Sequence, residues 1–524
     1  MNNKETGSYY TPDNLIQQMV KYVQDRSTPK KILEPSAGDG RFVPFLRSFE
    51  CPVTLVEIEE SKANELRKQH EKECTVLCKD FISYALESDD DYDLIIGNPP
   101  YICKKILTKE QRDTSLDMIN YFNLPESLFQ NIWISFILAA LKVLSANGTL
   151  FFVLPFEFLQ VQYAERLREF LETKFNTIEI TTFEDRVFPD IEQDVCLVYL
   201  SNEPEAKPYI QYTTVVSDSN FETVFQSVIM RNKPLKKWSN CILDDNETEK
   251  LRELALLFPQ ISSFGDISPG IVTGANSFFI VRKETKESFE MDDESFLPIV
   301  SKSSGLKPML ILRPSDFDDL ANKEIPIYLL NLTGIAEETF SENLVLHLNG
   351  GKESLIPSRY KCSKRKRWYD VPIVKNGQAC FFKRFSILPR LLVNSVNVHT
   401  TDIAYNIRFT DGFDPQSFAF CFYNSLTLAM CEYNGRFYGG GVGELVPSEF
   451  KQLHMPYKQI EEDKIAKLDE MFRGNRDINE IIDFVDNIVF DISADNLALL
   501  RNIRLRYVRR RLRLYKREEQ QHNG

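Results

Sequence analysis

The segment from Asn98 to Tyr101, Asn-Pro-Pro-Tyr, has the residue types of a polar clamp for a planar base. Asn98 offers a side-chain carbonyl oxygen, and Pro99 offers a backbone carbonyl from a residue without an amide hydrogen. Two such acceptors could hold an exocyclic amino group, while the ring of Tyr101 stacks on the base that carries it. The alternative is an ordinary strand-to-turn exit, because Asn and Pro are common turn residues.

A buried strand is expected to deliver this clamp. Residues 92–97 form a short, mostly apolar run that ends in Gly97, directly before Asn98. A continuous apolar run of this length is typical of a strand that is covered on both faces. The clamp should therefore lie at the carboxyl end of a central strand.

A glycine-containing loop lies upstream of the clamp. Gly38 and Gly40 follow an expected strand, residues 31–34, and precede an expected helix, residues 41–49. Glycines allow the backbone to approach a ligand closely, and Glu34 could accept a hydrogen bond from a positively charged group. The loop lacks the full G-x-G-x-x-G pattern of dinucleotide-binding proteins, so NAD is the poorer interpretation.

Two further expected strands are followed by acids. The strand at residues 53–56 leads into Glu57, and the strand at residues 75–78 is followed by Asp80. An acid in the position of Glu57 can receive both hydroxyls of a ribose. Either acid alone could be an ordinary loop residue, but the order of loop, acids and clamp favours a nucleoside-containing cofactor.

This order resembles the gamma class of amino-group DNA methyltransferases, the adenine-N6 enzymes of restriction-modification systems. The resemblance implies an α/β, Rossmann-like domain that binds S-adenosyl-L-methionine, followed by an α+β target-recognition domain. It implies that adenine is flipped out of duplex DNA into the clamp. The catalytic residues by resemblance are Asn98, Pro99, Pro100, Tyr101 and Phe188.

The resemblance also implies a set of cofactor contacts. Thr11-Pro12, before a helix expected at residues 13–24, would close over the methionine end of the cofactor. Phe188 precedes a strand expected at residues 195–200, and its alternative is a core phenylalanine. The cofactor-binding residues by resemblance are Thr11, Pro12, Glu34, Pro35, Gly38, Gly40, Glu57, Ile58, Asp80, Phe81, Asn98 and Pro100.

Length and composition predict a multidomain globular protein. The chain has 524 residues, of which 43% are hydrophobic and 12% aromatic, so two or three domains with substantial cores are expected. We expect a catalytic domain at 1–206, a linker at 207–239 and a target-recognition domain at 240–524. No apolar stretch is long enough for a bilayer span, and cysteines and histidines show no zinc pattern. The expectation is therefore a cytoplasmic, nucleoid-associated protein of a bacterium or archaeon, with neither membrane nor metal.

The net charge of −13 is unevenly distributed. Residues 1–200 carry 32 acids and 21 bases, whereas residues 359–384 carry nine bases and one acid. A basic run with interleaved aromatics favours phosphate contacts over a merely solvated loop. The expected DNA-binding residues are Lys364, Arg365, Lys366, Arg367, Trp368, Arg436 and Tyr438.

The C-terminus is expected to form a basic helix at 496–521. Its apolar side chains share roughly one face, so we expect it to dock on the second domain with its bases in solvent. Gly435 and Gly439–Gly441 surround Arg436 and Tyr438. These glycines could admit DNA backbone or could only form a tight hairpin.

The predicted activity is site-specific methylation of adenine N6 in double-stranded DNA, with a separate restriction endonuclease as a further partner. A cytosine-C5 enzyme is excluded, because it needs a Pro-Cys nucleophile and the chain has no Pro-Cys pair. Cytosine-N4 transfer stays open, since a similar clamp serves it. A DNA-binding specificity component with weak or no catalysis is the alternative from another class.

Overall fold

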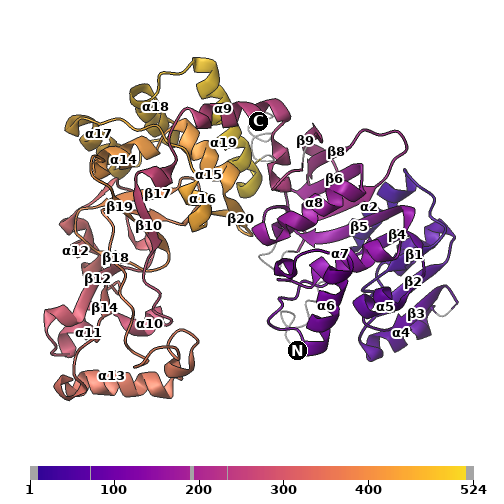
Figure 1. The fold of residues 1–524 in the computed structure, drawn as a ribbon, viewed down its shortest axis with the longest axis horizontal. Coiled ribbons are helices and arrows are strands. Elements are labelled where there is room, and N and C mark those ends of the chain that lie inside the picture. The colour runs from indigo at the N-terminus through magenta and orange to yellow at the C-terminus, as the bar shows by residue number, and fades with distance from the viewer. Residues whose placement is uncertain (1–9, 71, 189–193, 233, 515–524) are drawn as a thin grey trace. The chain divides into compact units, whose positions relative to one another are not determined.

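The computed structural model describes residues 10–70, 72–188, 194–232 and 234–514. The chain divides into two compact units. Figure 1 colours the ribbon by residue number, from indigo at the N-terminus to yellow at the C-terminus. Unit 1 comprises Met1–Thr248, Tyr438–Gly441 and Arg509–Gly524, and unit 2 comprises Glu249–Phe437 and Val442–Val508.

The centre of unit 1 is a mixed sheet. Its described strands follow the order β3-β2-β1-β4-β5-β7-β6-β8-β9 (Figure 1). Strands β1 to β5 pair in parallel, and β7 runs antiparallel to both β5 and β6. The strand order reverses between β1 and β4, and open α/β sheets bind ligands at such a switch point. The strands are β1 (Ile32–Glu34), β2 (Val53–Glu57), β3 (Cys74–Cys78), β4 (Tyr92–Gly97), β5 (Leu144–Pro155), β6 (Thr177–Phe183), β7 (Val195–Ser201), β8 (Tyr209–Val215) and β9 (Thr223–Met230).

Apolar side chains at helical spacing pack the helices of unit 1 onto this sheet. The first helix covers the range expected from the sequence, and it buries Leu15, Met19 and Val23 in one core with strand residues such as Leu94 and Phe151. The expected fold class, a Rossmann-like α/β domain followed by a second domain of mixed helices and strands, is confirmed. The helices are α2 (Asp13–Gln24), α3 (Val43–Leu46), α4 (Glu60–His70), α5 (Phe81–Glu87), α6 (Lys109–Tyr121), α7 (Trp133–Lys142), α8 (Glu165–Lys174) and, at the border of the units, α9 (Asp245–Leu256).

The expected linker at 207–239 is instead part of unit 1. Strands β8 and β9 extend the sheet beyond β6, and the Nε1 atom of buried Trp238 donates to Glu172 Oε1 at 2.7 Å. Arg168 is also buried and donates from Nε to the carbonyl of Lys236 at 3.1 Å. The first domain therefore ends near Thr248 rather than at residue 206, because these β-branched segments find partners in the sheet.

Unit 2 contains short strands and helices. Its strands are β10 (Gly265–Pro269), β11 (Ile280–Val281), β12 (Phe296–Val300), β13 (Ile311–Leu312), β14 (Tyr328–Leu330), β15 (Ala379–Phe382), β16 (Arg384–Phe385), β17 (Arg390–Asn394), β18 (His399–Thr400), β19 (Ala404–Phe409), β20 (Arg436–Tyr438) and β21 (Val442–Glu444). Its helices are α10 (Asn276–Phe279), α11 (Lys283–Ser288), α12 (Pro314–Asn322), α13 (Glu342–Glu353), α14 (Pro415–Phe422), α15 (Ser425–Asn434), α16 (Pro447–Lys451), α17 (Glu462–Arg473), α18 (Ile478–Val489) and α19 (Ala494–Leu512), the last of which continues into unit 1.

The helix expected at 496–521 corresponds to α19, and residues 515–521 of that range lie outside the described part of the chain. The expectation that its bases are solvated is wrong for Arg504, Arg510 and Arg511, which are at most 4% exposed. Among the described residues, no helix is long and apolar enough to cross a membrane. The same residues contain no group of three His, Cys, Asp or Glu side chains that could hold a metal ion.

Candidate active site

A pocket lies at the carboxyl ends of strands β1, β2, β3 and β4. The fold places it at the switch point because parallel strands deliver their following loops to one edge of the sheet. Ten of the twelve expected cofactor residues line it: Thr11, Glu34, Pro35, Gly38, Glu57, Ile58, Asp80, Phe81, Asn98 and Pro100.

Glu34 is the most unusual polar group in this pocket. It is only 2% exposed, and its Oε2 atom has no hydrogen-bond partner among the described residues. Burial, followed by the negative charges of Asp39 and Glu57, raises the pKa of Glu34 well above its ordinary value. A positively charged ligand group would offset the cost of ionising this buried carboxyl. The pocket therefore fits the ammonium and sulfonium charges of S-adenosylmethionine.

Glu57 organises the glycine loop. Its Oε2 accepts the amide hydrogen of Gly38 at 2.8 Å, and its Oε1 accepts that of Glu59 at 2.8 Å. A carboxylate oxygen has two lone pairs, so each can also accept a ribose hydroxyl. Glu57 thus joins the end of β2 to the loop after β1, and it can serve both the fold and the cofactor.

Gly38 and Gly40 in this loop have different surroundings. Both adopt positive φ angles, +57° at Gly38 and +80° at Gly40. Gly38 lines the pocket, whereas Gly40 and Pro12 are absent from its wall. A Cβ atom on Gly40 would lie 2.5 Å from Leu66 Cδ2. The structure therefore explains Gly40 by its packing against helix α4 rather than by ligand contact.

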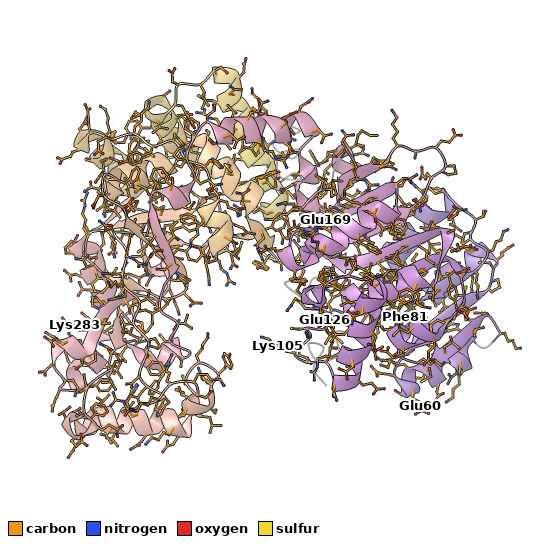
Figure 2. The ribbon with its side chains drawn as sticks, in the orientation of Figure 1. Glu60, Phe81, Lys105, Glu126, Glu169 and Lys283 are labelled. Carbon is orange, nitrogen blue, oxygen red and sulfur yellow. The ribbon has the colours of Figure 1, made fainter. Side chains whose placement is uncertain are left out.

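The loop after β3 supplies an acid and an aromatic wall. Asp80 caps helix α5, because its Oδ1 accepts the amide hydrogen of Ser83 at 2.8 Å. Phe81 is buried at the start of α5 (Figure 2), and its ring centroid lies 5.3 Å from that of Phe136. Ile58 is 54% exposed beside this wall. An acid next to stacked apolar surfaces suits the adenine ring of a cofactor.

Asn98 connects the clamp to the pocket. Its Nδ2 donates to Thr11 Oγ1 at 3.2 Å, and its backbone carbonyl accepts from Ser36 Oγ at 3.1 Å. Its Oδ1 accepts from the Tyr101 hydroxyl at 2.9 Å. The Thr11 and Tyr101 contacts therefore hold the side-chain amide of Asn98 in one orientation, and the Ser36 contact fixes its backbone.

The remaining clamp residues surround Asn98 differently. Pro100 lines the pocket, whereas Pro99 is buried and absent from its wall. Tyr101 is half-buried, and its hydroxyl also lies 3.0 Å from the carbonyl oxygen of Val153. Burial raises the pKa of Tyr101 well above its ordinary value, so the phenol stays protonated. Phe188 and Tyr101 pack against the same core of unit 1.

Several pocket residues were not expected from the sequence. Ile132 and Phe136 are four residues apart at the start of α7, so one turn of the helix places both on the pocket wall. Tyr10 also lines the pocket, and Arg41 lies over its ring, 5.1 Å from the centroid. The i, i+4 spacing could have indicated Ile132 and Phe136, but their helix is apolar on all faces.

The basic run of unit 2 divides into inward and outward side chains. Arg365 donates to the carbonyls of Val272 and Thr273 at 3.1 and 2.7 Å, and burial lowers its pKa. Arg367 binds both oxygens of Asp370 at 2.9 Å. These two guanidinium groups therefore stabilise unit 2 through internal contacts, and their expected use for DNA stays a prediction.

The outward side chains are lysines beside an aromatic ring. Lys361, Lys364 and Lys366 are exposed, and Tyr360 is 72% exposed. The ammonium groups of Lys361 and Lys364 lie 5.7 and 5.9 Å from the Tyr360 centroid. Trp368, in contrast, packs against the core of unit 2.

The glycine-rich hairpin is also explained by internal contacts. Arg436 donates to Glu449 at 2.7 Å, with both side chains largely buried. A Cβ atom on Gly441 would lie 2.5 Å from the Arg511 carbonyl oxygen, so this glycine allows a close approach to helix α19. Tyr438 is 39% exposed. Of the two residues, only Tyr438 has the exposure expected of a DNA contact.

Two family models match the chain. The Eco57I restriction-modification methylase model matches residues 45–188, and the model of the C-terminal domain of Type II methyltransferase M.Eco57I matches residues 235–490. The two models thus match successive parts of the chain, and the first includes the clamp.

Named Type II methyltransferases match most of the chain. Type II methyltransferase M.AccI of Acinetobacter calcoaceticus is 21% identical over 93% of this chain and 94% of its own length. M.XamI of Xanthomonas campestris pv. amaranthicola is 20% identical over 86% and 85% of the two chains. M.HindII of Haemophilus influenzae is 27% identical over 71% of each.

A solved structure supports the fold. The Type IIL restriction-modification enzyme MmeI, determined in complex with DNA, superimposes with a TM-score of 0.60 at 13% identity, covering 94% of this chain and 75% of MmeI. Gly38, the buried acids Glu34 and Glu57, and the clamp residues Asn98 and Pro100 line one pocket. Together with these matches, this shows that the chain belongs to the gamma class of restriction-modification DNA methyltransferases, which use S-adenosylmethionine and carry a C-terminal domain.

Proposed function

We propose that this enzyme methylates the N6 atom of adenine within a specific double-stranded DNA sequence. It acts as the modification enzyme of its system, and a separate restriction endonuclease that cuts the same sequence is its expected partner. The observation that supports the target atom is the position of Asn98, which begins the clamp and also lines the cofactor pocket. An amino group bound there would lie beside the methyl donor.

The orientation of Asn98 favours binding an amino group. Its Nδ2 faces Thr11 Oγ1, and its Oδ1 faces the Tyr101 hydroxyl. An amino group donates hydrogen bonds, so it would bind at Oδ1, either together with Tyr101 or in its place. The second amino hydrogen would be accepted by the carbonyl of Pro99, which the ring fixes in direction.

Tyr101 can adjust to the incoming base. Its hydroxyl has one proton and two acceptors at similar distances, Asn98 Oδ1 at 2.9 Å and Val153 O at 3.0 Å. The proton can therefore move fully to the Val153 bond when the base donates to Asn98. Its ring, with that of Phe188, packs against one core, and we assign both rings to the walls of the base pocket.

Positioning is the main contribution of the protein to this reaction. Bound S-adenosylmethionine supplies an electrophilic methyl group. The adenine amino nitrogen is a weak nucleophile because its lone pair is shared with the ring. Acceptors at Asn98 and Pro99 favour the pyramidal nitrogen that attacks, and they stabilise the positive charge that develops on it before its proton leaves.

The outward lysines of unit 2 are the proposed phosphate contacts. Lys364 and Lys366, with the neighbouring Lys361, present positive charge without carboxylate partners in the contacts described, and Tyr360 offers an exposed ring beside them. Such groups give sequence-independent affinity, whereas base contacts give specificity. We place Tyr438 among candidates for the second kind.

Identification of the methylated nucleoside tests the proposal. Purified protein is incubated with DNA from a methylation-deficient strain and with cofactor labelled in its methyl group, and the DNA is then digested to nucleosides. Label in N6-methyladenine, absent with Asn98→Ala, is the expected result. Label in N4-methylcytosine would show that the target is cytosine rather than adenine. Unlabelled DNA, although the protein binds the cofactor, would indicate a specificity component without catalysis.

A further inference from the structure

One arginine holds both ends of the connection that carries Phe188. Arg513 donates from Nη1 to the carbonyl oxygen of Glu184 at 2.9 Å, and its Nη2 forms an ion pair with Asp194. Glu184 directly follows β6, and Asp194 directly precedes β7. The three residues belong to unit 1, although Arg513 is more than 300 positions away in the sequence.

The backbone of Arg513 indicates that its side chain is needed. Its φ angle is +57°, and the amide of Leu514 donates to the carbonyl of Arg509 at 3.0 Å. This is the geometry in which helix C-termini usually carry glycine or asparagine, because other residues are strained there. An arginine at this position accepts that strain, and its guanidinium contacts both ends of the connection. The neighbouring Arg510 also interacts electrostatically with Glu184 and Asp194.

The connection is attached to the sheet at the same points. The amides of Glu184 and Asp185 donate to the carbonyls of Val215 and Val216 at 2.8 and 3.0 Å, and the carbonyl of Asp194 accepts from Phe156 at 2.8 Å. Phe156 directly follows β5, the strand whose Val153 carbonyl accepts from Tyr101. Phe188 lies four residues after Glu184 in the described part of this connection, so a shift of Glu184 would move Phe188 relative to Tyr101.

Arg510 strengthens this attachment from the preceding helical turn. It is buried, donates from Nε to the Tyr212 hydroxyl at 3.0 Å, and lies over the Phe156 ring, 5.1 Å from its centroid. The end of α19 is thus fixed to β8 and to the residue after β5. With the helix end fixed, the guanidinium of Arg513 can hold Glu184 and Asp194 at a constant separation, because it presents its donors in a rigid plane.

We propose that Arg513 is a positioning residue of methyl transfer. It sets the separation of Glu184 and Asp194 and thereby holds Phe188 against the flipped base. This inference rests on the proposed function. Removal of the bridge should leave the cofactor pocket intact, because that pocket contains no residue of the connection or of α19.

Two substitutions and a control separate the side chain from the backbone. Arg513→Gly removes the bridge and relieves the strained φ angle, so the helix end should stay folded. Arg513→Lys keeps the charge but can hold one end at a time. Asn475→Gly is the control, because it also places glycine at a positive φ angle, +49°, after a helix, but in unit 2. Each variant is measured for methyl transfer, cofactor affinity and backbone hydrogen exchange at residues 183–188.

Arg513→Gly should lower kcat about 10- to 100-fold, because small misplacements in an active site cost this much. Exchange at Glu184 and Asp185 should accelerate about tenfold or more, since local opening becomes easier. Cofactor affinity should stay within about twofold, because a group outside the pocket adds no binding energy. Arg513→Lys should recover part of kcat, and Asn475→Gly should match the wild type.

Unchanged kcat and exchange in Arg513→Gly, while Phe188→Ala loses transfer, would overturn the positioning role and leave the proposed function standing. A wild-type protein that methylates no DNA, with exchange still accelerated in Arg513→Gly, would refute the function and with it this role. If Arg513→Gly fails to fold, Asp194→Asn removes one end of the bridge without touching the helix. Wild-type kcat and exchange in Asp194→Asn would then overturn the proposal.

Discussion

Asn98 and Glu57 divide the work of the site between transfer and cofactor binding. Asn98→Ala removes the acceptor for the amino group but leaves Glu34 and Glu57 in place. We expect cofactor affinity within about twofold of wild type and a loss of kcat of about 100-fold or more, as for other groups that act on the reacting atoms. Calorimetric titration with cofactor and single-turnover methylation measure the two effects.

Glu57→Ala should show the opposite pattern. It removes two bonds to backbone amides and the acceptor for the ribose. Hydrogen bonds to charged groups contribute about 1.5–3 kcal/mol, so affinity should fall roughly 10- to 100-fold. Equal losses of cofactor affinity in Asn98→Ala and Glu57→Ala would contradict the division of roles.

Glu34 should make cofactor binding depend on pH. Its pKa is raised in the free protein by burial and by neighbouring acids, and a bound cation favours the ionised form. Binding therefore releases a proton, and affinity should rise with pH up to the raised pKa. Glu34→Gln should remove this dependence and weaken binding roughly 10- to 100-fold through the lost charged contact. Calorimetric titrations with cofactor across the pH range measure this dependence, and Glu60→Gln, at an exposed glutamate, is the control. A pH profile of affinity that does not change in Glu34→Gln would exclude Glu34 as its source.

The same residue affects the stability of the free protein with the opposite sign. A carboxyl whose pKa is higher in the folded state binds more protons there, so stability falls as pH rises from about 4.5 through the raised value. Glu34→Gln should therefore unfold at a higher denaturant concentration than wild type at neutral pH without cofactor. Lower stability of the variant would show that this carboxyl is ionised and satisfied in the free protein.

Among the structural elements, the loop between β1 and α3 depends on one glycine for packing. Gly40→Ala places a Cβ atom at a positive φ angle, which strains the backbone, and this atom clashes with Leu66. We expect a loss of about 2–3 kcal/mol in the free energy of unfolding. Gly334→Ala is the control, because Gly334 has a φ of +82° but no atom within 4 Å of the added carbon. Equal losses in the two variants, measured by denaturant unfolding, would remove the Leu66 contact from the explanation.

The exposed lysine cluster should determine the salt dependence of DNA binding. Lys364→Ala with Lys366→Ala removes two phosphate contacts, so the slope of log affinity against log salt should decrease by about 2. Lys283→Ala with Lys323→Ala removes equal charge elsewhere in unit 2 and should leave the slope unchanged; Figure 2 labels Lys283. A slope that the first pair does not change would exclude this cluster from the interface.

Local patterns predicted the elements around the pocket well. Helix α2 and strands β2 and β4 lie where apolar spacing and the following acids or clamp indicated. The signal is strong there because each strand is buried and short, and each functional residue directly follows it. The resemblance then identified ten of the pocket residues, including Glu34.

Other features depend on contacts that local patterns do not contain. The direction of Arg365 and Arg367 is set by carbonyls more than 30 residues away. Strand β8 pairs in parallel with β6, and this pairing turned an expected linker into sheet. Gly40 matched a ligand-binding pattern, but its neighbour is a leucine of helix α4.

We expect the two units of this chain together to recognise DNA and methylate it. The two family models match both parts of the chain, and the relatives M.AccI and M.XamI are matched over most of their own lengths. We therefore expect activity to be measurable with this chain alone.

The most direct test is long-read sequencing, with base-modification detection, of DNA from a methylation-deficient bacterium that expresses this chain alone. Expression of Asn98→Ala in the same strain is the control. We expect N6-methyladenine at one position of a recurring short sequence with the wild-type chain and none with the variant. Methylated cytosines, or adenine methylation that persists in the variant, would contradict the assignment of the Asn98 clamp to adenine N6.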